Sequence, residues 1–112
     1  MAELVGDEDD VAIAAITAAE LLVGVELADR RRRKHREAFV GAILSVVPLE
    51  PYDLQVARAH ASLLAHVRRT GRPRGAHDLI IAATAVASDR MVVTTDVKGF
   101  ESLPQVRVQP PA

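Results

Sequence analysis

Short apolar runs alternate along this chain with longer segments that have the periodicity of helices. The apolar runs have the length and the Val, Ile and Leu content of β-strands, at residues 11–16, 45–49, 91–94 and 106–108. The other segments place apolar residues three or four positions apart, which predicts helices over residues 17–28, 30–44, 53–70 and 78–89. This alternation predicts an α/β sandwich with a mainly parallel sheet.

The remaining segments are predicted as connections. Residues 1–5 are too short to be more than a helix end, and residues 6–10 (GDEDD) are expected to form a solvated turn. Residues 71–75 hold two Gly and one Pro, which predicts a loop. No linker divides the chain, so its 112 residues are expected to form a single domain.

Composition narrows the chemistry that this domain could perform. The chain has no Cys, which excludes disulfides, thiolate zinc sites and cysteine nucleophiles. The longest apolar stretch, residues 11–25, contains Glu20 and Gly24, so no transmembrane helix is expected. The first ten residues are acidic, which is the reverse of a signal peptide, and the protein is therefore expected to be cytoplasmic.

The formal net charge of −1 conceals an uneven distribution of charge. Five of the 15 acidic residues lie in the first ten positions, and six of the 14 basic residues lie between Arg30 and Arg36. That basic run surrounds its helix, so it is either a solvated helix end or an electrostatic contact with a polyanion. No aromatic residue interleaves with the run, so base stacking is not expected there.

Three carboxylates are candidates for chemistry because of their places relative to the predicted strands. Glu20 follows the strand at 11–16, Asp78 begins the helix at 78–89, and Asp96 follows the strand at 91–94. Ligands of open α/β sheets bind at the carboxyl ends of the strands, where acids that are distant in sequence can converge. Carboxylates without His or Cys suit Mg²⁺ or Mn²⁺, which can activate water and neutralise phosphodiester charge.

Each of these acids also has a purely structural interpretation. Thr17 and Glu20 have the spacing of a helix capping box, Asp78 suits a helix N-cap or first turn, and Asp96 suits a turn. Spacing alone leaves both interpretations open.

Three ordered segments of the chain resemble the PIN-domain nucleases of the VapC toxin family. They are ITAAELLVGVELA with Glu20 and Gly24, RGAHDLIIAATAVA with Asp78, and MVVTTDVKGF with Asp96 and Phe100. The resemblance implies a PIN-like three-layer sandwich and a Mg²⁺- or Mn²⁺-dependent endoribonuclease, with Glu20, Asp78 and Asp96 as catalytic and metal-site carboxylates. It also implies a homodimer and a cognate VapB-like antitoxin that enters the active-site groove.

The chain departs from the family pattern at two places. The family opens with a strand that ends in an Asp and with a helix, and neither is recognised here, so residues 1–112 are expected to be an N-terminally incomplete PIN-like domain. The family often has another acid just before the Phe, where this chain has Gly99. The alternative to an active nuclease is therefore a catalytically impaired PIN remnant that binds antitoxin and dimerises. A nucleotide-binding domain is a weaker alternative, because no glycine-rich phosphate loop is present.

Several other polar residues lie near the predicted acidic site. The arginines at or beside the 71–75 loop are candidates for gripping RNA phosphates, or else for surface solubility. His77 could contact the substrate or support the site, or simply be a helix-start His. Thr94 and Thr95 could orient Asp96 or a metal-bound water, or serve only to end their strand. The arginines are Arg68, Arg69, Arg72 and Arg74.

Overall fold

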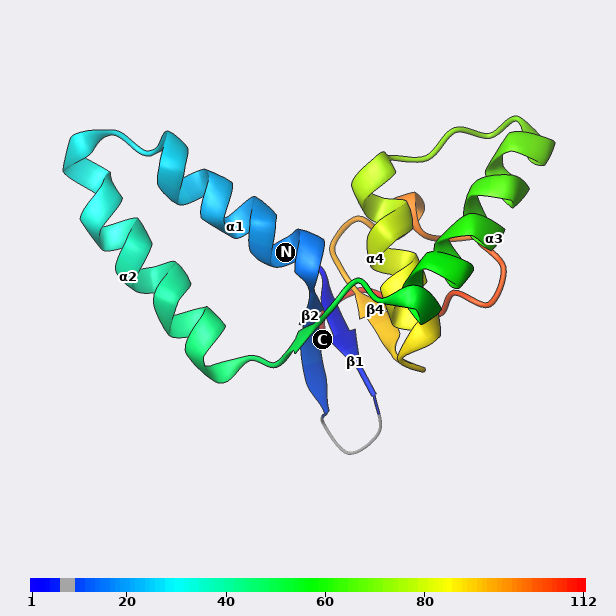
Figure 1. Ribbon diagram of the computed structural model, residues 1–112, viewed down its shortest axis with the longest axis horizontal. Helices are drawn as coiled ribbons and strands as arrows, with labels where there is room; N and C mark the ends of the chain where they lie inside the picture. The colour runs from blue at the N-terminus through cyan, green and yellow to red at the C-terminus, as the bar shows by residue number, and fades with distance from the viewer. Residues whose placement is uncertain (7–9) are drawn as a thin grey trace.

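A computed structural model describes residues 1–6 and 10–112, with a five-stranded sheet and four α-helices among them (Figure 1). The helices are α1 Ala15–Leu27, α2 Arg30–Val46, α3 Leu54–Thr70 and α4 Ala76–Ala87. The strands are β1 Glu3–Val5, β2 Val11–Ala14, β3 Leu49–Glu50, β4 Met91–Val93 and β5 Val108–Gln109, in the sheet order β3-β2-β1-β4-β5.

Four of the five strands in this described part of the sheet point in the same direction. β2 is parallel to β3, and β4 is parallel to β5, whereas β1 is antiparallel to both of its neighbours, β2 and β4. The prediction of an α/β fold with a mainly parallel sheet is therefore confirmed, with the central strand as the exception.

The prediction that residues 1–5 form no more than a helix end is wrong. Residues 3–5 form β1 because strands on both sides complete their hydrogen bonds, with Leu4 opposite Ala12 and Val92. All three of these side chains are fully buried. Of the predicted turn at residues 6–10, positions 7–9 lie outside the described residues, while the Gly6 N–H donates to the Asp10 carbonyl at 2.7 Å.

Several boundaries differ from the prediction: α4 covers Ala76–Ala87 rather than residues 78–89, and β5 covers Val108–Gln109 rather than residues 106–108. The boundaries of α1 and β3 differ as well. α1 begins at Ala15 rather than Thr17, so Thr17 lies buried inside the first turn and caps nothing. α2 continues to Val46, and of the predicted 45–49 strand only Leu49 pairs with β2, together with Glu50 beyond it. In both cases tertiary packing prevails over local preference, because helix and strand propensities differ by only a few tenths of a kcal/mol per residue.

The core lies where α4 packs between the sheet and α3. Ala82, Ala83 and Ala85 are completely buried, and such small side chains let a helix approach a sheet closely. Leu63 of α3 and Phe100 complete this cluster. The α1–α2 hairpin lies on the other side of the molecule and extends away from the sheet (Figure 1).

None of the helices in the described part of the chain is long and apolar enough to cross a membrane.

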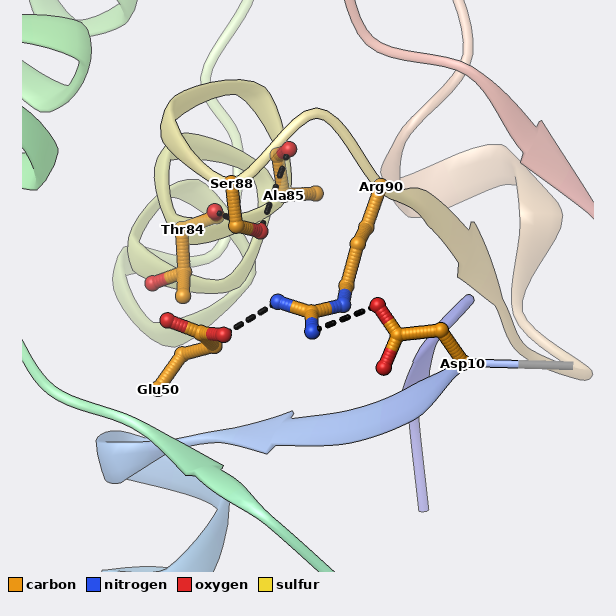
Figure 2. A network of polar contacts seen from close by, with 6 residues as sticks. All are labelled: Asp10, Glu50, Thr84, Ala85, Ser88 and Arg90. Atoms are coloured by element: carbon orange, nitrogen blue, oxygen red, sulfur yellow. Dashed lines mark hydrogen bonds and ion pairs between the residues drawn. The ribbon is translucent and has the colours of Figure 1, made fainter. Parts of the chain in front are cut away.

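The Arg90 side chain joins three segments at the end of the sheet away from the candidate site. Figure 2 shows its guanidinium between Glu50 of β3 and Asp10, just before β2; the Nη2 nitrogen donates to Asp10 Oδ2 at 2.8 Å and Nη1 donates to Glu50 Oε1. Burial by itself would lower the pKa of Arg90, but the hydrogen bonds and charges of Glu50 and Asp10 outweigh it and raise that pKa. The guanidinium therefore stays charged in its 11% exposed position.

Replacing Arg90 by Met is expected to lower the free energy of unfolding by about 2–3 kcal/mol, because the half-buried Glu50 carboxylate loses its partner. Urea denaturation measures the change. The matched control is Arg107→Met, which breaks the exposed ion pair with Asp89 and should change stability little. Equal losses in the two variants would contradict the structural role of Arg90.

Candidate active site

Asp78 and Asp96 reach the same point from two different elements. Asp78 lies in the first turn of α4, as predicted, and its helix begins after Gly75. Asp96 follows β4 and precedes the short 3-10 turn Val97–Gly99. The Asp96 N–H donates to Thr94 Oγ1 at 3.1 Å, so the buried Thr94 side chain fixes the backbone that carries Asp96.

Two glycines leave room for the paired carboxylates. A Cβ atom on Gly99 would lie 2.8 Å from Asp78 Oδ2 and 3.1 Å from Asp96 Oδ2, so the two oxygens flank one point in space. A Cβ atom on Gly75 would lie 3.2 Å from Asp78 Oδ2. The close approach of the carboxylates therefore depends on the absence of a side chain at position 99.

The electrostatics of Asp78 reflect this crowding. Burial raises the pKa of Asp78, the negative charges of Asp96 and Glu20 raise it further, and His77 lowers it in part. Each cause that raises the pKa is relieved when a cation enters the site, because a cation compensates both lost hydration and like-charge repulsion.

Glu20 is close enough to Asp78 for its charge to raise the pKa of Asp78, but it does not converge with Asp78 and Asp96 at one point. It lies on the exposed side of α1, and its Oε1 atom is 2.9 Å from His77 Nδ1. The predicted capping box does not form, because α1 begins before Thr17 and its N-cap residue, Ala14, makes no side-chain cap. Within residues 1–6 and 10–112, no three His, Cys, Asp or Glu side chains are gathered closely enough to hold a metal ion.

The donor set nevertheless suits a hard divalent cation. Asp78 and Asp96 present oxygen atoms side by side, and neither carboxylate is neutralised by an Arg or Lys in the hydrogen bonds and ion pairs of the described residues. Mg²⁺ is commonly bound through one or two carboxylates and retains several water ligands. Two converging carboxylates with a third nearby fit that requirement.

Of the four arginines predicted to bind phosphate, Arg74 binds the protein's own backbone. Its Nη1 and Nη2 atoms donate to the carbonyls of Lys98 and Glu101, each at 2.8 Å. Arg74 therefore fastens the turn after Asp96, a role that no sequence pattern indicated. Arg68, Arg69 and Arg72 are exposed. Arg72 and Arg74 border a groove of about 420 Å³ with His66, Thr70 and Ser102.

Other predicted residues lie as follows. His77 is exposed and contacts Glu20. Thr95 is exposed beside Asp96. Glu3 was not singled out in the sequence, yet the antiparallel direction of β1 sets it level with Val93, at the end of β4 that leads to Asp96. Only the pairing of β1 reveals this position.

Comparison with known proteins identifies the family. Residues 1–105 match the PIN domain family. VapC ribonuclease Y4jK of Sinorhizobium fredii is 37% identical over 94 residues, which cover 80% of this chain and 67% of that protein. The chain belongs to the VapC ribonuclease family of PIN domains. The tRNA(fMet)-specific endonuclease VapC of Salmonella typhimurium is 33% identical over 99 residues, which cover 87% of this chain and 72% of that protein.

Solved VapBC structures have the same fold. The crystal structure of DNA-bound VapBC from Salmonella typhimurium aligns with a TM-score of 0.83 at 30% identity, covering 88% of this chain and 74% of that chain. VapBC-5 from Mycobacterium tuberculosis aligns with a TM-score of 0.78 at 30% identity, covering 89% of this chain and 81% of that chain. The predicted VapC family, its ribonuclease class and the PIN-like fold are therefore confirmed.

Proposed function

We propose that this VapC-type PIN domain is a toxin that hydrolyses RNA phosphodiester bonds in the cytoplasm with Mg²⁺ or Mn²⁺. Asp78, Asp96 and Glu20 are its metal-site carboxylates, and residues 1–112 act as one domain. The observation that carries this proposal is the meeting of the Asp78 and Asp96 oxygens over Gly99 at the end of β4. Family membership supplies the class of substrate.

The residues of the site have different roles: some hold the cation, and others orient those residues or contact water. Asp78 and Asp96 would hold the cation, which when bound supplies positive charge for the phosphodiester and an acidified water. Thr94 orients Asp96 through its backbone N–H. Glu20 is exposed, so its carboxylate can rotate from His77 toward the other acids. Thr95 is exposed next to Asp96 in the chain and would contact a water there.

The arginines near the site have two roles in this proposal. Arg68, Arg69 and Arg72 are exposed at the end of α3 and in the following loop, where they suit RNA phosphates. Arg74 keeps the turn after Asp96 in place through its two carbonyl contacts, so it positions the site.

The expected protein partner is a VapB-like antitoxin. Support comes from the similar solved structures, which are VapBC complexes. The α1–α2 hairpin also exposes Leu22, Val23 and Leu27, which are 47%, 51% and 80% exposed, and a partner would cover such apolar side chains. A homodimer remains part of the proposal.

A second candidate is a catalytically impaired PIN remnant that binds antitoxin and dimerises. Two observations favour it. Glu20 contacts His77, and the described residues do not gather three His, Cys, Asp or Glu side chains at one point. Fewer charged ligands weaken the binding of a divalent ion.

Cleavage of a labelled RNA mixture by the purified chain distinguishes the two candidates. The nuclease proposal predicts cleavage with Mg²⁺ or Mn²⁺ and none after EDTA is added, with circular dichroism confirming that the protein is folded. A folded protein that cleaves no RNA with either ion would support the remnant instead.

A further inference from the structure

The basic run at the start of α2 is placed where it does not favour the helix. Arg30–Arg33 occupy the first turn, which contains no acidic residue, and the N-terminus of a helix is already positive. All residues from Arg30 to Phe39 are exposed, and only Val40 of α2 is buried. Arg33 pairs with Glu26 of α1 at 3.3 Å, but neither core packing nor helix stability accounts for the rest of the positive charge.

Two adjoining hollows connect this charge to the candidate active site. A groove of about 380 Å³ between α1 and α2 is bordered by Glu20, Gly24, Arg36 and Phe39. A second hollow of about 350 Å³ shares Gly24 and Arg36 and continues to Arg32 near the tip of the hairpin. Together they form a track from the hairpin tip to Glu20.

Gly24 gives this track its depth. A Cβ atom there would lie 3.6 Å from Arg36 Nη1 and 3.8 Å from Arg36 Cδ, so the Arg36 side chain lies across the glycine. Gly24 is one helical turn after Glu20, so the Arg36 guanidinium lies about 6 Å along α1 from the acid. Arg32 precedes Arg36 by one turn of α2, so both project into the track.

An aromatic side chain lies in the same track. Phe39 is 61% exposed and borders the groove with Arg36. No aromatic residue interleaves with the basic run in the sequence, but the fold brings Phe39, three residues beyond it, beside Arg36 in one groove. Arginines that contact phosphates, together with an exposed aromatic ring, are the usual features of sites for single-stranded nucleic acid.

We propose that the groove between α1 and α2 is a track for single-stranded RNA, in which Arg32 and Arg36 contact phosphates and Phe39 stacks on a base. The inference rests on the proposed ribonuclease function. An acidic protein segment would also meet the arginines, but it supplies no phosphodiester for the carboxylates of Glu20, Asp78 and Asp96. RNA has to bring a phosphodiester to those carboxylates, so the track carries it in the required direction.

Binding of a fluorescently labelled, unstructured 12-nucleotide RNA tests the track without catalysis. All variants are made in an Asp78→Asn background, and anisotropy is measured without divalent ions at several salt concentrations. Arg32→Gln/Arg36→Gln is expected to weaken binding about tenfold and to reduce the slope of log K against log salt by about 1.4, or 0.7 for each phosphate contact. Arg58→Gln/Arg107→Gln removes the same charge elsewhere and should leave the slope unchanged.

Stacking is tested by two substitutions at one position. Phe39→Ala is expected to weaken RNA binding about tenfold without changing the salt slope, and Phe39→Tyr should restore it. Equal affinity and slope in the arginine pair and its control would overturn the track. Cleavage of RNA by the wild-type chain would still stand in that case, so the proposed function and the track fail separately.

Discussion

Asp78→Asn is expected to reduce metal-dependent RNA cleavage by about 100- to 1,000-fold and to leave the protein folded. Asp78 shares its site with Asp96, and an amide removes one of the two converging negative charges. Such a loss weakens both cation binding and the stabilisation of charge on the phosphodiester. Initial rates on one RNA substrate at saturating Mn²⁺ measure the effect.

The same substitution should stabilise the metal-free protein at neutral pH. The folded state raises the pKa of Asp78 above its ordinary value of 3.8, so the ionised carboxylate costs stability at pH values above the raised pKa. This cost disappears as the pH falls below 3.8, where Asp78 is protonated in both states. Asp78→Asn is therefore expected to raise Tm by about 2 °C at pH 7, in EDTA, and not at all at the acidic limit.

Asp89→Asn is the matched control for this substitution. Asp89 is 99% exposed, lies after α4 and has a φ of 54°, a conformation that Asn tolerates well. It should change neither cleavage nor the pH dependence of Tm. Full activity of Asp78→Asn, or an equal loss in Asp89→Asn, would contradict the assignment of the site.

Gly99→Ala is expected to reduce cleavage about 10- to 100-fold at nearly unchanged stability. The added Cβ would lie 2.8 Å from Asp78 Oδ2 and 3.1 Å from Asp96 Oδ2, so at least one carboxylate has to turn away. Both atoms are the ends of flexible side chains, which makes the fold tolerant, but displacements of about 1 Å cost large factors in rate. Initial rates and urea denaturation measure the two effects.

Gly41→Ala provides the comparison for Gly99→Ala. Gly41 lies within α2, and a Cβ atom there would meet nothing within 4 Å. This variant should retain full cleavage and gain about 0.5–1 kcal/mol of stability, because Ala favours a helix over Gly. If Gly99→Ala retained the same activity as Gly41→Ala, the two carboxylates would not depend on the open position.

The elements that carry the candidate acids could be predicted from local pattern. The mostly apolar α4 and the Val-rich β4 have strong signatures. These signatures place Asp78 at the start of the helix and Asp96 after the strand. β1 could not be predicted, because three residues become a strand only when β2 and β4 pair with them. The start of α1 was missed for a related reason, since strand and helix preferences compete at residues 15–16.

Contacts between segments that are distant in the sequence could not be predicted from it either. Arg74 is separated by more than 20 residues from the carbonyls that it contacts, and Gly99 matters only because two carboxylates converge on it. Phe39 became a candidate for base stacking only when the hairpin placed it in one groove with Arg36. Such relations depend on the direction of side chains in the fold, which periodicity does not specify.

Mn²⁺ binding tests most directly the proposal that Asp78 and Asp96 form a divalent-cation site. Metal-free wild-type protein, Asp96→Asn and Asp89→Asn would each be titrated with Mn²⁺, and the electron paramagnetic resonance signal of free Mn²⁺ would be followed. We expect one saturable site in the wild type and in Asp89→Asn, and binding at least about tenfold weaker in Asp96→Asn. Equal Mn²⁺ affinity in Asp96→Asn and the wild type would contradict the site.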